Sequence, residues 1–241
     1  MRALVVLPTF NEAENIIGFL RAVRHAVPEA DVLVVDDNSP DGTAALAEET
    51  AAELGRIKVL HRAGKLGLGA AYRHGFTTAF DETYDVIASM DSDYSHDPYV
   101  IPTMFRLLAD GADVVIGSRY VPGGDTVDWP RRRQLLSKWG NRYTAGILRL
   151  PIRDCTSGFR AYRAAALKAI DPASTSAEGY AFLTELVRKL IANGATIVET
   201  PIVFRDRRFG TSKMSGRIIA ESMLLVTKWG LLDRTRRQPT R

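Results

Sequence analysis

The first 43 residues, MRALVVLPTFNEAENIIGFLRAVRHAVPEADVLVVDDNSPDGT, decide the fold class. Ala3–Leu7 is a short, continuous apolar run, and Val32–Val35 is a second one that leads into two aspartates. Between these runs, apolar residues recur at helical spacing, at Ile16, Leu20, Val23 and Val27. Fully apolar strands joined by a helix are typical of a parallel sheet that is buried on both faces. The stretch therefore predicts a β-α-β unit.

The same alternation continues over the N-terminal half of the chain. Further strands are expected at Ile57–Leu60, Val86–Met90 and Val114–Ile116, and helices at Asn11–Val27, Asp41–Leu54, Leu68–Phe80 and Tyr99–Ala109. We therefore expect an α/β fold with a mostly parallel sheet flanked by helices. Ligands of such sheets lie outside the carboxyl ends of the strands. Here those ends are Pro8–Glu12, Asp36–Asp41, Asp91–Asp93 and Gly117–Arg119.

The second half is less regular. A polar loop at Gly123–Arg133 precedes an expected helix that ends at Leu150, and a helix at Glu178–Asn193 and a strand at Thr196–Phe204 follow. A basic loop at Arg205–Ser212 then leads to a final helix, Met214–Leu232, and a basic tail. Because no repeat, low-complexity block or linker divides the chain, we expect one domain over residues 1–241.

Composition restricts the class of protein without choosing a function. The 241 residues are 46% hydrophobic and 25% charged, which is enough for a globular core. The net charge of +4 suits an anionic partner such as a nucleotide, a lipid phosphate, a membrane or a nucleic acid. The single cysteine, Cys155, excludes an intramolecular disulfide and favours a reducing compartment. We expect neither a signal peptide nor a transmembrane segment, because no apolar stretch approaches about eighteen residues.

The sharpest signal of chemistry is Asp91-Ser92-Asp93, directly after the apolar run Val86–Met90. Two carboxylates one residue apart at a strand end can face the same divalent cation. Mg²⁺ prefers oxygen ligands and commonly joins protein carboxylates to substrate phosphates, and a metal neutralises the charge of a diphosphate leaving group. A solvated acidic turn is the ordinary alternative, but the position at the end of a buried strand favours a metal site.

Two other strand ends carry residues suited to a nucleotide. In Asp36-Asp37-Asn38-Ser39-Pro40-Asp41-Gly42-Thr43, the residues from Ser39 onward are typical of a turn and a helix cap. Asp36 and Asp37 are the better ligand candidates, because carboxylates accept hydrogen bonds from a base or a ribose hydroxyl. In Pro8–Glu12, Phe10 is a candidate to pack on a base, although Asn11 alone is typical of a helix cap.

Gly67-Leu68-Gly69 resembles part of a dinucleotide-binding fingerprint, but we reject NAD binding. Tyr72 occupies the position of the third glycine, and the segment follows the third strand rather than the first. The glycines are better explained by a tight turn and close helix packing, with Lys65 free to face an anion.

Basic residues are the last signal: Arg119, Arg131–Arg133, Arg207, Arg208 and Lys213. Arginine and lysine both bind phosphate. Arg119 ends a strand on the side where Asp91 is expected, and Arg207 and Lys213 flank a glycine in a loop that follows a strand, so we expect these three to bind anions. The run Arg131–Arg133 fits either a phosphate site or a solvated face.

Together these motifs resemble those of the dolichol/polyprenol-phosphate mannose synthases, which are inverting GT-A glycosyltransferases of family 2. The matching stretches are Pro8–Glu12, Asp36–Thr43, Asp91–Asp93, Gly117–Tyr120, Cys155–Arg160 and Asp206–Lys213. Their order and spacing over nearly the whole chain are far more specific than any one motif. The resemblance implies a Rossmann-like GT-A fold in which residues 1–120 bind the nucleotide sugar. Residues 121–213 would form the acceptor side, and residues 214–241 an amphipathic helix with a basic tail.

The resemblance also implies substrates and site residues. The family transfers mannose from GDP-mannose to a polyprenyl or dolichyl phosphate with a divalent metal, Mg²⁺ or Mn²⁺. Carried over by position, the donor ligands are Pro8, Phe10, Glu12, Val35, Asp37, Asp91, Ser92, Asp93, Arg207 and Lys213. The metal ligands are Asp91, Asp93 and Ser95, the last at a position where the family often has glutamine. The acceptor phosphate is expected at Arg119 and Arg131, and the residues assigned to catalysis are Asp91, Asp93 and Arg119.

The expected mechanism needs no strong general base. The acceptor phosphate is already ionised at neutral pH, so attack opposite the leaving group gives a β-mannosyl product through positioning and charge stabilisation. Three alternatives stay open: a uridine donor such as UDP-glucose, a sugar nucleotidyltransferase, and a basic adaptor without catalysis. The nucleotidyltransferase is disfavoured because Pro8–Glu12 is not a glycine- and arginine-rich loop, and the acidic strand ends disfavour nucleic acid.

A lipid acceptor implies action at the cytoplasmic face of a membrane, on the surface itself or with a membrane-anchoring partner protein. Met214–Leu232 has apolar residues between Arg217 and Lys228, with Trp229 near its end. This pattern is typical of an interfacial helix and equally of an amphipathic helix packed on the sheet.

Overall fold

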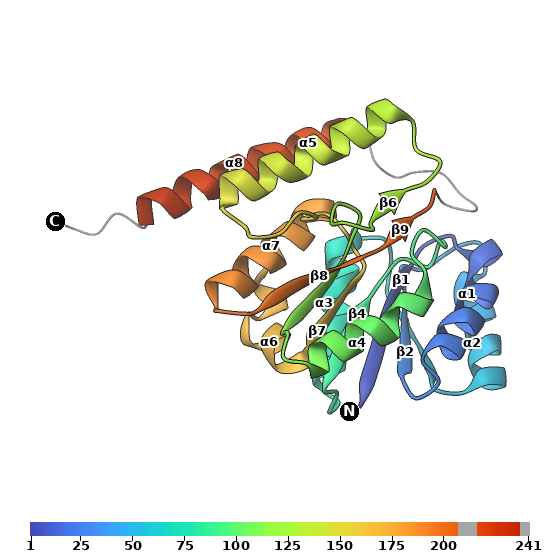
Figure 1. The fold of residues 1–241 in the computed structure, drawn as a ribbon. Helices are drawn as coiled ribbons and strands as arrows, with labels where there is room; N and C mark the ends of the chain where they lie inside the picture. The colour runs from blue at the N-terminus through green and yellow to red at the C-terminus, as the bar shows by residue number, and fades with distance from the viewer. Residues whose placement is uncertain (207–215, 237–241) are drawn as a thin grey trace.

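A seven-stranded sheet lies between two layers of helices in the computed structural model, which describes residues 1–206 and 216–236 (Figure 1). The strand order is β3-β2-β1-β4-β7-β5-β8. The strands are β1 (Ala3–Thr9), β2 (Asp31–Asp36), β3 (Ile57–His61), β4 (Val86–Ser89), β5 (Val114–Ser118), β7 (Arg160–Arg163) and β8 (Ile197–Pro201). Within the described residues, the pairs of this sheet are parallel except the two formed by β7. The predicted α/β fold with a mostly parallel sheet is therefore confirmed.

The helices divide between the two faces because strand side chains alternate. Val5 and Leu7 of β1 pack in one apolar core with α1 (Ala13–Ala26), α2 (Thr43–Leu54) and α4 (Ile101–Ala109). Leu4 and Val6 pack in the other core with α3 (Leu68–Phe80), α6 (Ala164–Ala169) and α7 (Gly179–Ala192). Short 3-10 helices stand at Pro98–Val100 (η1) and Pro172–Ser174 (η2). Burial on both faces explains why the strands are continuous apolar runs in the sequence.

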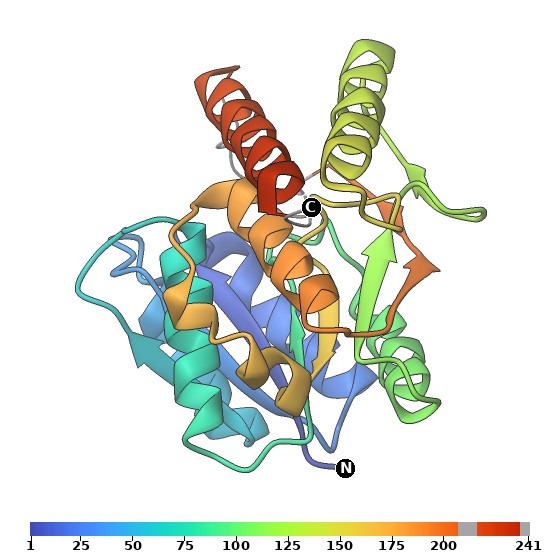
Figure 2. The same ribbon diagram turned by 90° about the vertical axis from the view of Figure 1, so that its left-hand side faces the viewer.

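Two long helices, α5 (Arg131–Leu148) and α8 (Gly216–Arg236), lie beyond the carboxyl ends of the central strands and diverge from one another (Figures 1 and 2). They are joined by a hydrogen bond of 2.7 Å between the hydroxyls of Tyr143 and Thr227, and Gly230 packs against Ile147. An ion pair between Arg188 and Asp233 ties α8 to α7. The C-terminal helix therefore packs on other helices rather than on the sheet. Among the described residues, no helix is long and apolar enough to span a bilayer.

The main departure from the predicted elements is β7, which lies antiparallel between β4 and β5. The sequence did not indicate it, because its four residues begin and end with arginine. Arg160 is nevertheless fully buried, and its guanidinium donates to the carbonyl oxygens of Ser157, Leu183 and Cys155 at 2.7, 2.7 and 2.8 Å. Satisfied hydrogen bonds make this burial tolerable.

A second departure concerns the strand predicted at Thr196–Phe204. The structure divides it into β8 and a short strand, β9 (Val203–Phe204), which pairs with β6 (Asp125–Thr126) in a separate two-stranded sheet. This small sheet joins the polar loop before α5 to the segment that follows β8. It also places Phe204 against His96, beside the site described below.

Candidate active site

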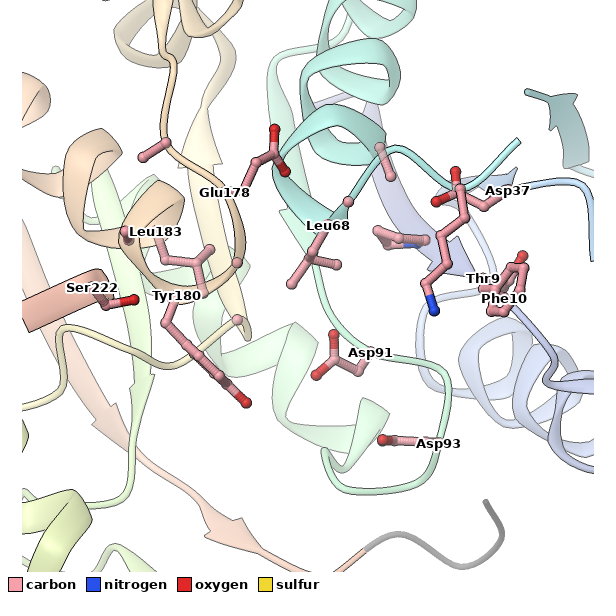
Figure 3. Close-up of a pocket in the computed structure, with 18 of the residues that line it drawn as sticks. Thr9, Phe10, Asp37, Leu68, Asp91, Asp93, Glu178, Tyr180, Leu183 and Ser222 are labelled. Carbon is pink, nitrogen blue, oxygen red and sulfur yellow. The ribbon is translucent and has the colours of Figure 1, made fainter. Parts of the chain in front are cut away.

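A cavity of about 680 Å³ opens at the carboxyl ends of β1, β2 and β4 (Figure 3). Figure 3 shows Asp91 and Asp93 between two walls, with Phe10 and Asp37 on one side and Glu178 and Tyr180 on the other. Seven of the predicted donor ligands line it: Pro8, Phe10, Glu12, Asp37, Asp91, Ser92 and Asp93. We call this space the first cavity.

The loops after β1 and β2 are joined to each other by hydrogen bonds. The backbone N–H groups of Asn11 and Glu12 donate to the hydroxyls of Ser39 and Thr43 at 3.1 and 2.9 Å. Asn11 has a φ of 58°, a left-handed conformation that asparagine tolerates better than most residues. It turns the chain into α1, which begins two residues later than predicted. These bonds hold Phe10 and Glu12 at the edge of the first cavity.

The two aspartates after β2 have different environments. Asp36 is buried and accepts hydrogen bonds from the hydroxyls of Thr9 and Ser39 at 2.8 and 2.6 Å, so it stabilises the loop. Asp37 forms a buried ion pair with Arg62 and faces the first cavity. Burial raises the pKa of Asp37, and the lowering effect of Arg62 does not offset it. Of the two candidates, the geometry favours Asp37 as the ligand.

Val35 and Lys65 are the remaining residues of this wall. The Val35 side chain is fully buried in the core beside α3, and Val35 is not among the residues that line the first cavity. Lys65 places its ammonium 4.1 Å from the centroid of the Phe10 ring and lines the cavity. An exposed lysine over an aromatic face gains about 0.5–1 kcal/mol.

The Asp91-Ser92-Asp93 segment follows β4 and is mostly buried. Asp93 is 3% exposed and accepts a hydrogen bond of 3.0 Å from the backbone N–H of Ser95. The Nδ1 atom of His96 lies 3.4 Å from the backbone N of Asp91, which donates to it. Burial lowers the pKa of His96 to about 4, so the ring is neutral at physiological pH and can accept this bond. His96 therefore helps to fix the backbone that presents both carboxylates.

This segment provides a donor set that suits a hard divalent cation. The hydroxyls of Ser92 and Ser95 are buried and have no hydrogen-bond partner within the described ranges, and the same is true of Tyr72. No group of three or more His, Cys, Asp or Glu side chains among the described residues forms a closed cage for a metal. Two carboxylates with nearby hydroxyls match a Mg²⁺ or Mn²⁺ site completed by substrate oxygens and water. The residues thus fit the predicted metal.

A second cavity, of about 450 Å³, lies between the Asp91–Asp93 segment and helices α5 and α8. Arg119 lines it from the end of β5, and its Nε and Nη2 atoms each donate 2.7 Å hydrogen bonds to the carboxylate of Asp154. Burial alone would lower the pKa of Arg119, but Asp154 and, more weakly, the phenols of Tyr120 and Tyr180 raise it. The guanidinium is therefore fixed and permanently charged, and it forms part of the wall of the second cavity.

Aromatic rings surround this cation. The guanidinium carbon of Arg119 lies 5.2, 5.8 and 5.4 Å from the ring centroids of Tyr120, Trp129 and Phe204. The ring of Phe204 also packs edge-on against His96, with centroids 5.3 Å apart. The small β6–β9 sheet and the segment from Asp91 to His96 are thus parts of one packed unit.

The basic run Arg131–Arg133 forms the first turn of α5, and its members differ in exposure. Arg131 is exposed in the first turn of α5 and is not among the residues that line either cavity. Arg133 lines the second cavity, forms an ion pair of 3.2 Å with Asp206, and lies 3.9 Å from the centroid of the Trp129 ring. The structure therefore places Arg133, and not the predicted Arg131, at the wall of the second cavity. The predicted ligands Arg207 and Lys213 lie outside the described residues.

The match to a known family covers more than half of the chain. Residues 4–171 of the 241 fit the sequence profile described as Glycosyl transferase family 2. The chain belongs to glycosyl transferase family 2. This family 2 chain is 47% identical to polyprenol monophosphomannose synthase of Mycolicibacterium smegmatis, over 98% of this chain and 90% of that protein. It is also 47% identical to undecaprenyl-phosphate mannosyltransferase of Micrococcus luteus, over 97% and 96% of the two chains.

Solved structures show that the fold is shared more widely. Glucosyl-3-phosphoglycerate synthase from Mycobacterium tuberculosis, in complex with phosphoglyceric acid, has a TM-score of 0.68 at 19% identity, covering 94% of this chain and 80% of that chain. Mannosyltransferase PcManGT from Pyrobaculum calidifontis, in complex with GDP-Man and Mn²⁺, has a TM-score of 0.66 at 17% identity, covering 100% of this chain and 66% of that chain. At these identities the likeness shows the fold, and the family 2 assignment is consistent with it.

Sequence reasoning missed several residues of this family 2 glycosyltransferase site. These residues are distant in sequence from the strand ends at which ligands were expected. They are Asp154, Glu178, Tyr180 and Ser222. The resemblance included the stretch Cys155–Arg160, but it did not indicate that the preceding residue, Asp154, pairs with Arg119. Glu178 forms an ion pair with Arg73 of α3, and its Oε2 atom lies 3.3 Å from the backbone N of Ala70. Only the folded chain brings these groups together.

Proposed function

We propose that this chain transfers mannose from GDP-mannose to the phosphate of a polyprenyl or dolichyl lipid, with inversion at the sugar. The observation that carries the proposal is the meeting of two cavities at Asp91 and Asp93, which line both. One cavity suits a nucleotide diphosphate sugar, and the other presents Arg119 and Arg133 to an anion. The relatives at 47% identity, a polyprenol monophosphomannose synthase and an undecaprenyl-phosphate mannosyltransferase, support this pair of substrates.

The donor occupies the first cavity in this proposal. Pro8, Phe10, Glu12 and Asp37, with the backbone of Val35, hold guanosine, because they line or support the wall built from β1 and β2. Asp91 and Asp93, with Ser95 beside them, hold the divalent metal. When bound, the metal supplies positive charge that neutralises the diphosphate as the glycosidic bond breaks. Arg207 and Lys213 are proposed as further diphosphate contacts from the segment that follows Asp206.

The acceptor phosphate occupies the second cavity. Arg119 and Arg133 bind its oxygens, while Asp154 keeps the Arg119 guanidinium oriented and charged. An ionised phosphate oxygen is the nucleophile, so no side chain needs to remove a proton. The chain contributes by holding this oxygen beside the donor sugar and by compensating charge. In this division residues 1–120 supply most donor contacts and residues 121–213 most acceptor contacts within one catalytic unit.

The lipid portion of the acceptor implies that the protein works at a membrane surface, and α5 has a face suited to bind one. Leu135, Leu136 and Trp139 are 68%, 50% and 56% exposed, and exposed Arg131 and Arg132 precede them. Leu136 and Trp139 also line the second cavity, so this apolar face continues into the acceptor site. Apolar and aromatic side chains beside basic ones are typical of helices that lie in a membrane interface. We propose that α5, together with α8, rests on the cytoplasmic face of the membrane, alone or with a membrane-anchoring partner.

A transfer assay tests the function. Purified protein is incubated with a short polyprenyl phosphate, Mn²⁺ or Mg²⁺, and either GDP-mannose, UDP-glucose or UDP-GlcNAc. The expected result is metal-dependent mannosyl lipid from GDP-mannose alone, with loss of product when the metal is chelated. Product from a uridine donor would replace the proposed donor, and metal-independent product would contradict the role of Asp91 and Asp93.

A further inference from the structure

Tyr180 stands at the boundary between the two cavities. Among the residues that the structure describes, six line both of them: Asp91, Asp93, Gly158, Tyr180, Ala181 and Ser222. Two of the six are acidic, and two have no polar side-chain atom. Within the described part of the chain, Tyr180 and Ser222 are thus the residues that bring a neutral hydroxyl donor to this boundary. The transferred sugar must cross here, because its donor and acceptor lie on opposite sides.

The backbone conformation before Tyr180 sets the direction in which its side chain leaves the chain. Gly179 has a φ of 57°, a conformation that glycine adopts without strain, and it starts α7 with Tyr180 in the first turn. The preceding loop is fixed by Glu185, whose Oε2 atom accepts hydrogen bonds of 3.2 and 3.0 Å from the backbone N–H groups of Ser176 and Ala177. In Figure 3 the Tyr180 ring points toward the space beside Asp91. The backbone that carries Tyr180 is therefore fixed by contacts within the chain.

The charges on either side of Tyr180 define what its hydroxyl can do. On the acceptor side, Tyr180 lines the second cavity together with Arg119. On the donor side, Tyr180 lines the first cavity together with Asp91. An acceptor phosphate bound to Arg119 would approach two carboxylates and a second anion, the donor diphosphate. A neutral hydroxyl can bind a phosphate oxygen there without adding negative charge, and hydrogen bonds to ionised acceptors are the stronger kind.

We propose that the Tyr180 hydroxyl donates a hydrogen bond to the acceptor phosphate and holds its attacking oxygen toward the anomeric carbon of the donor sugar. This inference rests on the proposed function. During transfer, the bond between that carbon and the donor phosphate oxygen breaks, and its electron pair leaves with GDP. The acceptor oxygen forms the new bond with its own electron pair. Tyr180 keeps its proton throughout, so its contribution is the position of the nucleophile.

The variant Tyr180→Phe tests this role, because it keeps the ring and removes the hydroxyl. Loss of one hydrogen bond to a charged group corresponds to a decrease of about 10- to 100-fold in kcat/KM for the acceptor. The KM for GDP-mannose, metal-dependent GDP binding and Tm are expected to stay at wild-type values. Tyr99→Phe is the matched control, since Tyr99 is 55% exposed, bonds His25 and lies outside both cavities.

A binding measurement separates this inference from the proposed function. The dissociation constant of citronellyl phosphate is measured in the presence of GDP and Mn²⁺, and we expect Tyr180→Phe to weaken it about tenfold. Equal binding and equal turnover in wild type and variant would overturn the role of Tyr180 and leave the proposed function intact. Weaker phosphate binding in the variant, with no mannosyl transfer by the wild type, would uphold Tyr180 as a phosphate ligand and overturn the donor assignment.

Discussion

The two cavities share Asp91 and Asp93 but are built in different ways. The first takes half of its polar residues from the ends of adjacent parallel strands, where β1, β2 and β4 are paired in register. The second takes most of its residues from α5, α7, α8, Phe204 of β9 and the loop at residues 156–158. Strand ends are fixed by the sheet itself, whereas the second cavity depends on contacts between distant segments. The donor side should therefore tolerate changes that disable the acceptor side, and the reverse.

The largest effect is expected where the cavities meet. Asp91→Asn and Asp93→Asn each remove a charge from the proposed metal site, and we expect transfer to fall by roughly 1000-fold or more, because charge stabilisation of the leaving group is lost. Metal-dependent GDP binding, followed by calorimetry, should weaken in parallel. Asp97→Asn is the control, since Asp97 caps η1 through the backbone N–H of Tyr99 and lines neither cavity. Near-normal turnover in both site variants would refute the metal assignment.

A second prediction compares two arginines in the first turn of α5, Arg133 and Arg131. Arg133→Ala is expected to raise the KM for the acceptor about tenfold, because it loses a charge-assisted hydrogen bond to phosphate. Arg131→Ala should change it by less than about twofold, since exposed surface charges contribute little. GDP-mannose KM should not change in either variant. The opposite ranking would restore Arg131 as the acceptor ligand and would mean that α5 shifts when the lipid binds.

A third prediction tests the membrane surface of α5. The double variant Leu135→Ser, Trp139→Ser should reduce flotation with anionic vesicles several-fold, because two apolar side chains no longer enter the interface. Turnover of a short acceptor in detergent should fall less than flotation does, although Trp139 also lines the second cavity. Tyr99→Ser, another exposed aromatic, is the control. Unchanged flotation would move the docking surface away from α5.

The smallest effect concerns the pH dependence of the donor side. Because burial raises the pKa of Asp37, its carboxylate takes up a proton at a higher pH than an ordinary aspartate does. If the ionised form binds the guanine base, affinity decreases as the pH is lowered toward that raised pKa. Guanosine binding, followed by NMR to avoid titration of the GDP phosphates, should weaken about two- to threefold on acidification. Asp37→Asn should abolish this dependence, and a persisting dependence would assign it to another group.

The contrast between the cavities also explains what could be predicted from sequence. Apolar periodicity located β1, β2 and β4, and the strand-end rule then placed Asp37, Asp91 and Asp93 together, as the structure confirms. The pairing of Arg119 with Asp154 and the aiming of Tyr180 depend on contacts between segments far apart in the chain. No local pattern encodes such contacts. The choice of Arg133 over Arg131 likewise depends on the angle at which α5 leaves the domain.

The chain between β5 and β7 can vary without disturbing the rest of the sheet. The chain leaves the sheet at Ser118, the end of β5, and re-enters it at Arg160, where β7 pairs with β5 itself. The segment that includes β6 and α5 is thus an excursion of the chain, inserted between two strands that are neighbours in the sheet. Its length and sequence can change while β1, β2 and β4 keep their register. Changes in this excursion would therefore alter one wall of the second cavity, to which α7 and α8 also contribute, while the strand ends that line the first cavity stay as they are.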